Sequence, residues 1–354
     1  MLTQTKPVDP SATAARDAYY DEISGQGLAP LWVRLKGLVT REPQPKMQPF
    51  GWRYANIRPV LMQSAELLST EEAERRVLIL ENPGFKGQSK MTGSLFAGLQ
   101  LLMPGERARS HRHVASALRF ILEGASAYTA VDGERTVMHP GDFVLTPSWA
   151  WHDHGNDGDV PVIWLDGLDI AVVNLFDASF AEEYHEPEFP LKRAAGESEW
   201  RYSGTMAPEN DKITAPYSPL LNYRYERSRE ALAALAKGGE PDATHGFKLR
   251  YINPQTGGAP MPTISAAMQL LPKGFKTAEY RATDATVFVG VEGRGQTRIG
   301  DFTFDWGPKD IFAVPSWVPV SHHAADEAVL FSYSDRAAQE RLGIWREKRD
   351  RQNS

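Results

Sequence analysis

The sequence of 354 residues contains no cysteine. This excludes disulfides, thiolate nucleophiles and sulfur-ligated metals, and leaves histidine, aspartate and glutamate to hold a metal ion. Basic blocks are also lacking and the formal net charge is −6, so no nucleic-acid partner is expected. No apolar run approaches the roughly 20 residues that span a bilayer, and the N-terminus lacks a secretory signal. We therefore expect a soluble, cytoplasmic protein with no membrane partner.

The sequence pattern changes from helical to β-rich at Val77. Before it, polar helical stretches alternate with proline breaks, and helices are expected over 11–23 and 69–76. After it, short β-rich runs are punctuated by Gly, Pro and Asp, which is typical of antiparallel sandwiches and barrels. A further helix is expected over 227–237. The predicted parts are an N-terminal helical arm (1–76), a first barrel (77–185), a linker with a helical insert (186–245), a second barrel (246–334) and a C-terminal helix (335–354).

An internal repeat relates the two β-rich regions. Residues 101–124 align without a gap to 270–293, and 141–154 align to 309–322. Each half contains a turn glycine, a strand that ends in Glu-Gly, and a Pro-Ser-Trp segment before the next strand. The repeat predicts an all-β fold of two tandem copies of one barrel.

Three histidines of the first copy form a candidate metal site. His111 and His113 lie on the same face of a predicted strand because successive side chains alternate, and His152 can join them from a neighbouring strand. Neutral imidazoles suit Fe, Zn, Cu or Ni and leave positions open for other ligands. The alternative is that His-x-His arose by accident, with each histidine at the surface or satisfied in the core.

The second copy lacks these ligands. The positions opposite the three histidines carry Tyr280, Ala282 and Val320, of which the tyrosine is only a weak ligand. One metal site is therefore expected per chain.

The spacing around the histidines resembles the two motifs of the cupin superfamily, whose fold is a jelly-roll barrel. One motif is Gly-x5-His-x-His-x10-Gly, from Gly105 to Gly124, and the other is Gly-x5-Pro-x4-His-x3-Asn, from Gly141 to Asn156. Most metal-binding cupins have a glutamate ligand where this sequence has Ala117. A neutral ligand set leaves a divalent ion more positive, which favours bidentate binding of a hydroxy-carboxylate.

Two charged or titratable residues share the predicted metal-facing side. Arg119 lies six residues after His113, and an arginine inside a small barrel needs an anion, either a substrate carboxylate or an internal acid. Its counterpart in the second copy is Phe288, so the arginine accompanies the metal site. His154 follows His152 by two residues and is a candidate base or substrate contact, or alternatively a rim histidine.

Other residues complete the candidate pocket. Gln100, Gly98 and Phe96 share one face of a strand and offer a donor, open space and a ring surface, although Phe96 fits an ordinary core role equally well. Asp166 interrupts an apolar strand, so it is expected to pair with an arginine or to face substrate.

The runs 97–124 and 128–156 look like the gentisate 1,2-dioxygenase family, bicupins that include salicylate and 1-hydroxy-2-naphthoate dioxygenases. The similarity covers about residues 45–345. It implies a bicupin with one Fe(II) per chain in the first, metal-binding barrel, a degenerate metal-free second barrel, and O2 as co-substrate. The implied reaction is extradiol-type cleavage of the C1–C2 bond of gentisate, a small aromatic hydroxy-carboxylate, to maleylpyruvate.

The resemblance also implies roles for individual residues. Arg119 and His154 would hold the substrate carboxylate, with Arg75 as a further basic contact. Gln100 would line the pocket and Asp166 would contact the second ring hydroxyl. His154 and Asp166 are the catalytic candidates, whether they move protons or orient the ring. The family forms homotetramers, and the N-terminal arm suits contact with neighbouring subunits.

Phe96 departs from the family pattern, in which gentisate-preferring relatives often have Tyr and those acting on monohydroxylated acids have Trp. Cleavage of salicylate or 1-hydroxy-2-naphthoate is therefore the alternative activity. Two hypotheses of a different kind are a non-catalytic bicupin that binds a small ligand, and a zinc or nickel cupin with hydrolytic or isomerase chemistry.

Overall fold

The computed structural model describes residues 10–73, 75–202, 204, 207–213 and 215–349. The chain divides into an N-terminal unit, 1–44, and a body, 45–354. The N-terminal unit contains α1 (Pro10–Gly25) and α2 (Leu31–Leu38), so the helix predicted over 11–23 is confirmed. Among the described residues, no helix has both the length and the apolar character needed to cross a membrane.

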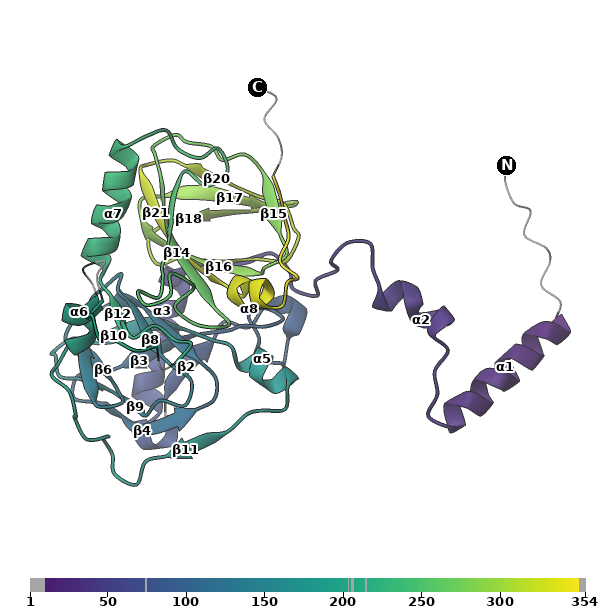
Figure 1. Ribbon diagram of the computed structural model, residues 1–354, viewed down its shortest axis with the longest axis horizontal. Coiled ribbons are helices and arrows are strands. Elements are labelled where there is room, and N and C mark those ends of the chain that lie inside the picture. Colours follow the sequence, from purple (N-terminus) through teal and green to yellow (C-terminus); the bar gives the residue numbers. More distant parts are fainter. Residues whose placement is uncertain (1–9, 74, 203, 205–206, 214, 350–354) are drawn as a thin grey trace. The chain divides into compact units, whose positions relative to one another are not determined.

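The first barrel consists of two antiparallel sheets (Figure 1). One sheet has the strand order β12-β8-β5-β10-β3-β2, and the other has β11-β4-β9-β6-β7. The strands in chain order are β2 (Arg76–Ile79), β3 (Phe96–Leu102), β4 (Arg107–His113), β5 (Ala117–Glu123), β6 (Ala127–Val131), β7 (Glu134–Val137), β8 (Phe143–Thr146), β9 (His152–Asn156), β10 (Val162–Leu168), β11 (Ala181–Glu183) and β12 (Asn222–Tyr223).

The second barrel repeats this plan with the orders β1-β19-β16-β21-β14-β13 and β18-β17-β20-β15-β22. Its strands are β1 (Phe50–Trp52), β13 (Phe247–Arg250), β14 (Ser265–Leu271), β15 (Tyr280–Ala282), β16 (Thr286–Glu292), β17 (Gly295–Ile299), β18 (Phe302–Trp306), β19 (Ile311–Val314), β20 (Val320–Ala324), β21 (Ala328–Ser334) and β22 (Glu347–Arg349). The two matching sets of sheets confirm the all-β fold and the repeat.

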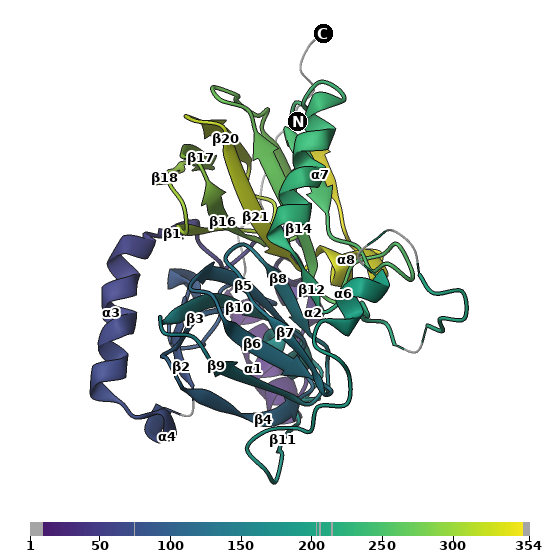
Figure 2. The same cartoon turned by 90° about the vertical axis from the view of Figure 1, so that its left-hand side faces the viewer.

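The two halves exchange their leading strands. β1 precedes the first barrel in sequence but pairs with β19 of the second, whereas β12 precedes the second barrel but pairs with β8 of the first. β1 continues into α3 (Tyr54–Leu67), which contacts β2 of the first barrel. β12 continues into α7 (Tyr225–Lys237), which contacts β13 and β14 of the second barrel; Figure 2 shows α3 and α7 on opposite sides of the body. The linker therefore supplies a strand to the first barrel, and the predicted helical insert is present as α7.

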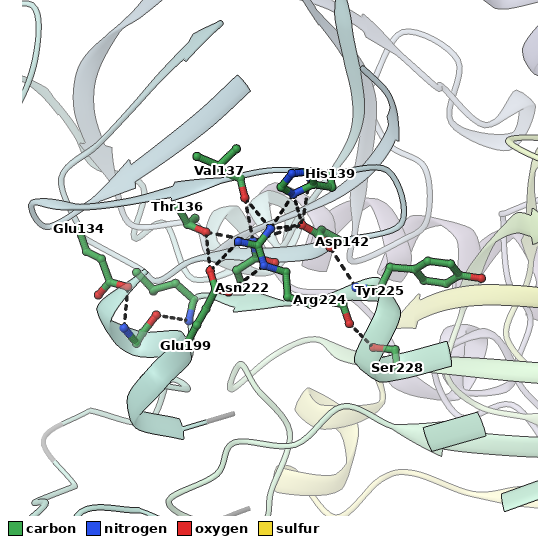
Figure 3. A network of polar contacts seen from close by, with 12 residues as sticks. Glu134, Thr136, Val137, His139, Asp142, Glu199, Asn222, Arg224, Tyr225 and Ser228 are labelled. Carbon is green, nitrogen blue, oxygen red and sulfur yellow. Dashed lines mark hydrogen bonds and ion pairs between the residues drawn. The ribbon is translucent and has the colours of Figure 1, made fainter. Parts of the chain in front are cut away.

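A polar network holds the linker against the first barrel (Figure 3). Arg224 donates to the fully buried carboxylate of Asp142 over 2.9 Å and to the carbonyl of Val137 over 2.8 Å. It also pairs with Glu199 over 2.7 Å, on α6 (Glu197–Tyr202). Because a buried carboxylate is costly without a partner, Arg224 makes this docking specific.

A continuous apolar core joins the two barrels. Phe120 of the first stacks on Phe331 of the second, with 4.1 Å between ring centroids. Equivalent aspartates add reciprocal contacts: Asp169 accepts from Thr263 in the second half, and Asp335 accepts from Ser94 in the first over 2.5 Å.

Short elements complete the body. The helix predicted over 69–76 is present but shorter: α4 spans Thr70–Ala73, and Arg76 already belongs to β2. Ser69 and Glu72 form a reciprocal capping box at its start. The predicted C-terminal helix is α8 (Arg336–Arg341), which is shorter than expected because Gly343, with φ 72°, turns the chain into β22. Residues 350–354 of that prediction lie outside the described chain. The remaining elements are η1 (Pro83–Phe85) and α5 (Ile170–Leu175).

Candidate metal centre and active site

The three candidate ligands come together from two neighbouring strands. His111 on β4 is the register partner of His152 on β9, and His113 follows two residues later on β4. Ring centroids lie 4.0 Å apart for His111 and His152, and 4.8 Å apart for His113 and His152. The potential ligand nitrogens all lie within 4.8 Å of one another. Alternation along β4 and pairing with β9 thus converge the imidazoles as predicted.

Hydrogen bonds set the tautomer of each imidazole. The Nδ1 of His111, His113 and His152 lies 3.0, 2.6 and 2.9 Å from a backbone carbonyl oxygen. A carbonyl only accepts, so each Nδ1 carries the proton and each Nε2 has a free lone pair. Among the described residues, the buried Nε2 atoms of His111 and His152 have no hydrogen-bond partner. This arrangement fits a transition-metal ion bound through three Nε2 atoms.

Burial keeps these histidines neutral. Desolvation lowers the pKa of His111 to about 3 and that of His113 to about 4, and it lowers the pKa of His152 well below its ordinary value. Among the described residues, no carboxylate joins this group. Ala117, at the position where many cupins have glutamate, lines the cavity instead. A bound divalent ion would therefore keep its full charge.

Arg119 is held rigidly inside the barrel, with a side chain 4% exposed. It donates through Nη1 to Thr146 over 2.5 Å and through Nη2 to His154 over 2.9 Å. Its Nε lies 3.5 Å from Asp166, which is an ion pair but too long for a strong hydrogen bond. Burial lowers the pKa of Arg119 to about 10, so the guanidinium remains charged at neutral pH.

The ring of His154 is hydrogen-bonded to Arg119. Arginine can only donate, so the Nε2 of His154 accepts and its Nδ1 donates to Thr129 over 3.0 Å. Both ring nitrogens are therefore engaged. Desolvation lowers the pKa of His154 well below its ordinary value, and the positive charge of Arg119 lowers it further. The ring is therefore neutral.

Asp166 faces Arg119 across paired strands. On β10 it lies opposite Gly98 of β3 on one side and Arg119 of β5 on the other. Its Oδ1 accepts from the indole of Trp164 over 3.0 Å. Burial raises the pKa of Asp166 to about 6, and Arg119 opposes that rise.

These residues surround one cavity of about 230 Å³. Phe96, Gln100 and Arg75 line it as the sequence predicted, and Arg75 lies at an exposed position. The Nε2 of Gln100 is buried and has no hydrogen-bond partner in the part of the chain that the structure describes. Gly98 makes room for Phe96, because a Cβ at 98 would lie 3.0 Å from its Cε1 and 2.6 Å from a methyl group of Val77.

Sequence reasoning missed two sets of residues. The first is the apolar lining, namely Val77, Ile79, Leu168 and Ile170. Strand alternation could have indicated Val77 and Ile79, which lie two apart on β2. The second set consists of Thr146, Thr129 and Trp164, which hold Arg119, His154 and Asp166. No sequence signal singles these residues out, because their roles depend on contacts between strands.

Comparison with known proteins agrees with this geometry. The family model described as a cupin domain matches residues 98–168. Gentisate 1,2 dioxygenase 1 of Aquipseudomonas alcaligenes is 55% identical over 341 residues, which are 96% of this chain and 98% of the relative. A gentisate 1,2-dioxygenase of a Streptomyces species is 39% identical over 94% of this chain and 95% of the relative. The crystal structure of salicylate 1,2-dioxygenase from Pseudoaminobacter salicylatoxidans, with gentisate adducts, has a TM-score of 0.91 at 32% identity and covers 99% of this chain and 97% of its own.

The paired barrels, the buried three-histidine site and these likenesses define a bicupin ring-cleaving dioxygenase. The chain belongs to the gentisate 1,2-dioxygenase family.

Proposed function

We propose that the protein is an iron(II)-dependent dioxygenase that splits the C1–C2 bond of gentisate with O2 to give maleylpyruvate. The observation that carries this proposal is the buried Arg119–Asp166 pair in the cavity of the three histidines. It offers a cation for a ring carboxylate and an anion for a second ring hydroxyl. The 55% identity to a gentisate dioxygenase supports the same substrate.

His111, His113 and His152 would hold the iron through their Nε2 atoms. Bound there, iron(II) would supply chelation of the adjacent hydroxyl and carboxylate oxygens and the electron transfer that reaction with O2 requires.

The surrounding side chains would bind and orient the ring. Arg119 is proposed to bind the carboxylate, with Arg75 adding positive charge at an exposed edge of the cavity. We assign His154 a positioning role, because its Nε2 already accepts from Arg119. Asp166 would accept the hydrogen bond of the second hydroxyl. Phe96 and Gln100 would form walls of the cavity beside the ring.

The test is O2 uptake by Fe(II)-loaded protein with gentisate, salicylate and 1-hydroxy-2-naphthoate. We expect the highest kcat/KM for gentisate, and a product that carries two heavy oxygen atoms when ¹⁸O2 is supplied. Absence of turnover with gentisate would overturn the proposal. A product with a single labelled oxygen would overturn the dioxygenase step.

Salicylate cleavage is the second candidate, and Phe96 is the observation that favours it. Phenylalanine has no hydroxyl at the cavity wall, so this position supplies no hydrogen bond that would select a dihydroxylated ring. Faster uptake with salicylate than with gentisate would decide for this activity.

We also propose that the protein forms a homotetramer in which α2 contacts another subunit. Leu31, Trp32, Val33 and Leu38 of this helix are 56%, 65%, 60% and 68% exposed, an apolar surface typical of interfaces. Deletion of residues 1–44 should lower the number of subunits per particle, which light scattering gives as the ratio of the particle mass to the mass of the shortened chain. An unchanged tetramer would contradict a role for α2, and a full-length monomer would contradict the assembly.

A further inference from the structure

The second barrel contains a cavity of about 310 Å³ at the position that holds the metal site in the first. Tyr280, Ala282 and Val320, the counterparts of the three histidines, line it. The repeat has therefore lost its metal ligands but retained an interior space. The chemistry of this space is set by the side chains that replaced them.

Lys248 brings a positive charge into this cavity. On β13 it pairs with Gln269, just as Val77 on β2 pairs with Gln100. An apolar lining residue of the active site is thus a lysine in the second barrel. The ammonium lies 5.8 Å from the ring centroid of Phe288, the residue that replaces Arg119. The cation inside the first barrel, Arg119, lies on β5, whereas the cation inside the second barrel, Lys248, lies on β13.

Lys248 has no close anionic partner among the described residues. Within the described part of the chain no hydrogen bond or ion pair includes it, and Asp284 acts on it only through space. Asp284 instead accepts from the indole of Trp345 over 2.8 Å. Burial lowers the pKa of Lys248 to about 8, so the lysine is still mostly charged at neutral pH. An unpaired charge in such surroundings is expensive, and a bound anion would offset that cost.

The balance of charge around the cavity is positive. Its described lining contains four cationic side chains and two carboxylates: Lys248, Arg250, Arg336 and Arg349 against Asp284 and Glu347. Arg336 pairs outside the cavity with Glu340 over 2.7 Å, and Arg349 pairs with Glu347 over 3.1 Å. Arg250 likewise has no ion pair among the described residues, but it lies at an exposed position where water can solvate its charge. Lys248 is thus the cation for which a bound anion would matter most.

The rest of the lining suits an organic ligand. Val314, Pro315, Val318 and Trp345 give apolar walls, and the ring of His245 packs edge-on against Tyr280 at 4.7 Å. The Nδ1 of His245 is buried, has no hydrogen-bond partner within the described residues, and can contribute one hydrogen bond. A molecule with an apolar body and one anionic group matches this combination.

We propose that the second barrel binds a small organic monocarboxylate, with the carboxylate paired to the ammonium of Lys248. This site is separate from the ring-cleaving site, and its occupancy does not depend on turnover. The proposal holds whether or not gentisate is the substrate.

The experiment is ¹⁹F NMR titration of the full-length protein with 4-fluorobenzoate, which lacks the ortho-hydroxyl needed to chelate a metal. We expect two bound populations. Lys248→Met should weaken one of them at least about tenfold, since a charge-assisted hydrogen bond is lost. Arg119→Met should weaken the other and leave the Lys248-dependent population intact.

Three further measurements separate the effect of charge from an effect on the fold. Ala282→Phe fills the second cavity while keeping the lysine, and it should remove the same population as Lys248→Met. The neutral analogue 4-fluorobenzamide should not bind there. Gentisate turnover by Lys248→Met should equal that of the natural protein, which shows that the first barrel is intact. A single population that Arg119→Met removes, or two populations that both survive Lys248→Met and Ala282→Phe, would overturn the site.

Discussion

The guanidinium of Arg119 donates to the Nε2 of His154 over 2.9 Å, and this bond determines what the histidine can do. A ring nitrogen that accepts from arginine cannot at the same time take a proton from substrate. This contact supports the proposal that His154 contributes by fixing the direction of Arg119, whose own charge would then be available for a carboxylate.

This relationship predicts different kinetics for the two residues. Arg119→Met should lower kcat/KM by roughly 10- to 100-fold, because a charge-assisted contact of about 1.5–3 kcal/mol is lost. His154→Gln, which keeps an acceptor, should raise KM by a smaller factor and leave kcat nearly unchanged. Steady-state O2 uptake measures both. Equal losses in kcat for the two variants would show instead that His154 acts directly in the reaction.

Removing one imidazole should empty the metal site. Three neutral nitrogens are the ligand set on the described residues, so His152→Ala leaves only two and should reduce the metal content from near one per chain to near zero. Elemental analysis measures this. His322→Ala is the matched control at the position equivalent to His154 in the second barrel, and its metal content should stay at the natural value.

Asp166 predicts a pH dependence for gentisate cleavage. Burial raises its pKa to about 6, so the carboxylate that would accept from the second hydroxyl predominates only above that pH. Activity should rise with pH through about 6 and level off above it. In Asp166→Asn this rise should disappear from the kcat/KM profile, while turnover of salicylate should be affected less. A persistent rise in the variant would assign the titration to another group.

Gly98 predicts a change in substrate preference. An added Cβ would lie 3.0 Å from Phe96 and 2.6 Å from Val77, so Gly98→Ala should displace the ring at the cavity wall. We expect the ratio of kcat/KM for gentisate to that for salicylate to shift several-fold. Gly93→Ala is the control, since a Cβ there meets nothing within 4 Å. If Gly98→Ala leaves this ratio unchanged, the position of the Phe96 ring does not determine substrate preference.

The Arg224 network predicts a contribution to stability. Arg224→Met leaves the fully buried Asp142 without its cation and should lower the free energy of unfolding by roughly 1–3 kcal/mol, measured by urea denaturation. The comparison is Arg201→Met, whose pair with Glu197 is exposed and should contribute less than about 1 kcal/mol. Similar losses in both variants would show that burial of Asp142 adds nothing.

Much of the site could be predicted because its signals are local. His111 and His113 share a face through strand alternation, and the same parity placed Arg119 on their side. The repeat identified two barrels and showed that Tyr280, Ala282 and Val320 replace the ligands. These inferences need only the geometry of a single strand and a comparison of the chain with itself.

Other features could not be predicted. The exchange of β1 and β12 joins residues that lie far apart in sequence, and each strand is too short for its pattern to specify a partner. The neutral acceptor state of His154 and the placement of Lys248 beside Phe288 also arise from contacts between strands.

The amino-acid sequence alone identifies the two-barrel repeat, the three candidate ligands and their replacement in the second copy. The folded chain is needed to establish which strand completes each barrel, which nitrogen of each histidine is free, and where the unpaired ammonium lies. The physical reason is that alternation is a property of one strand, whereas pairing, tautomer and charge compensation are properties of neighbours that the fold brings together.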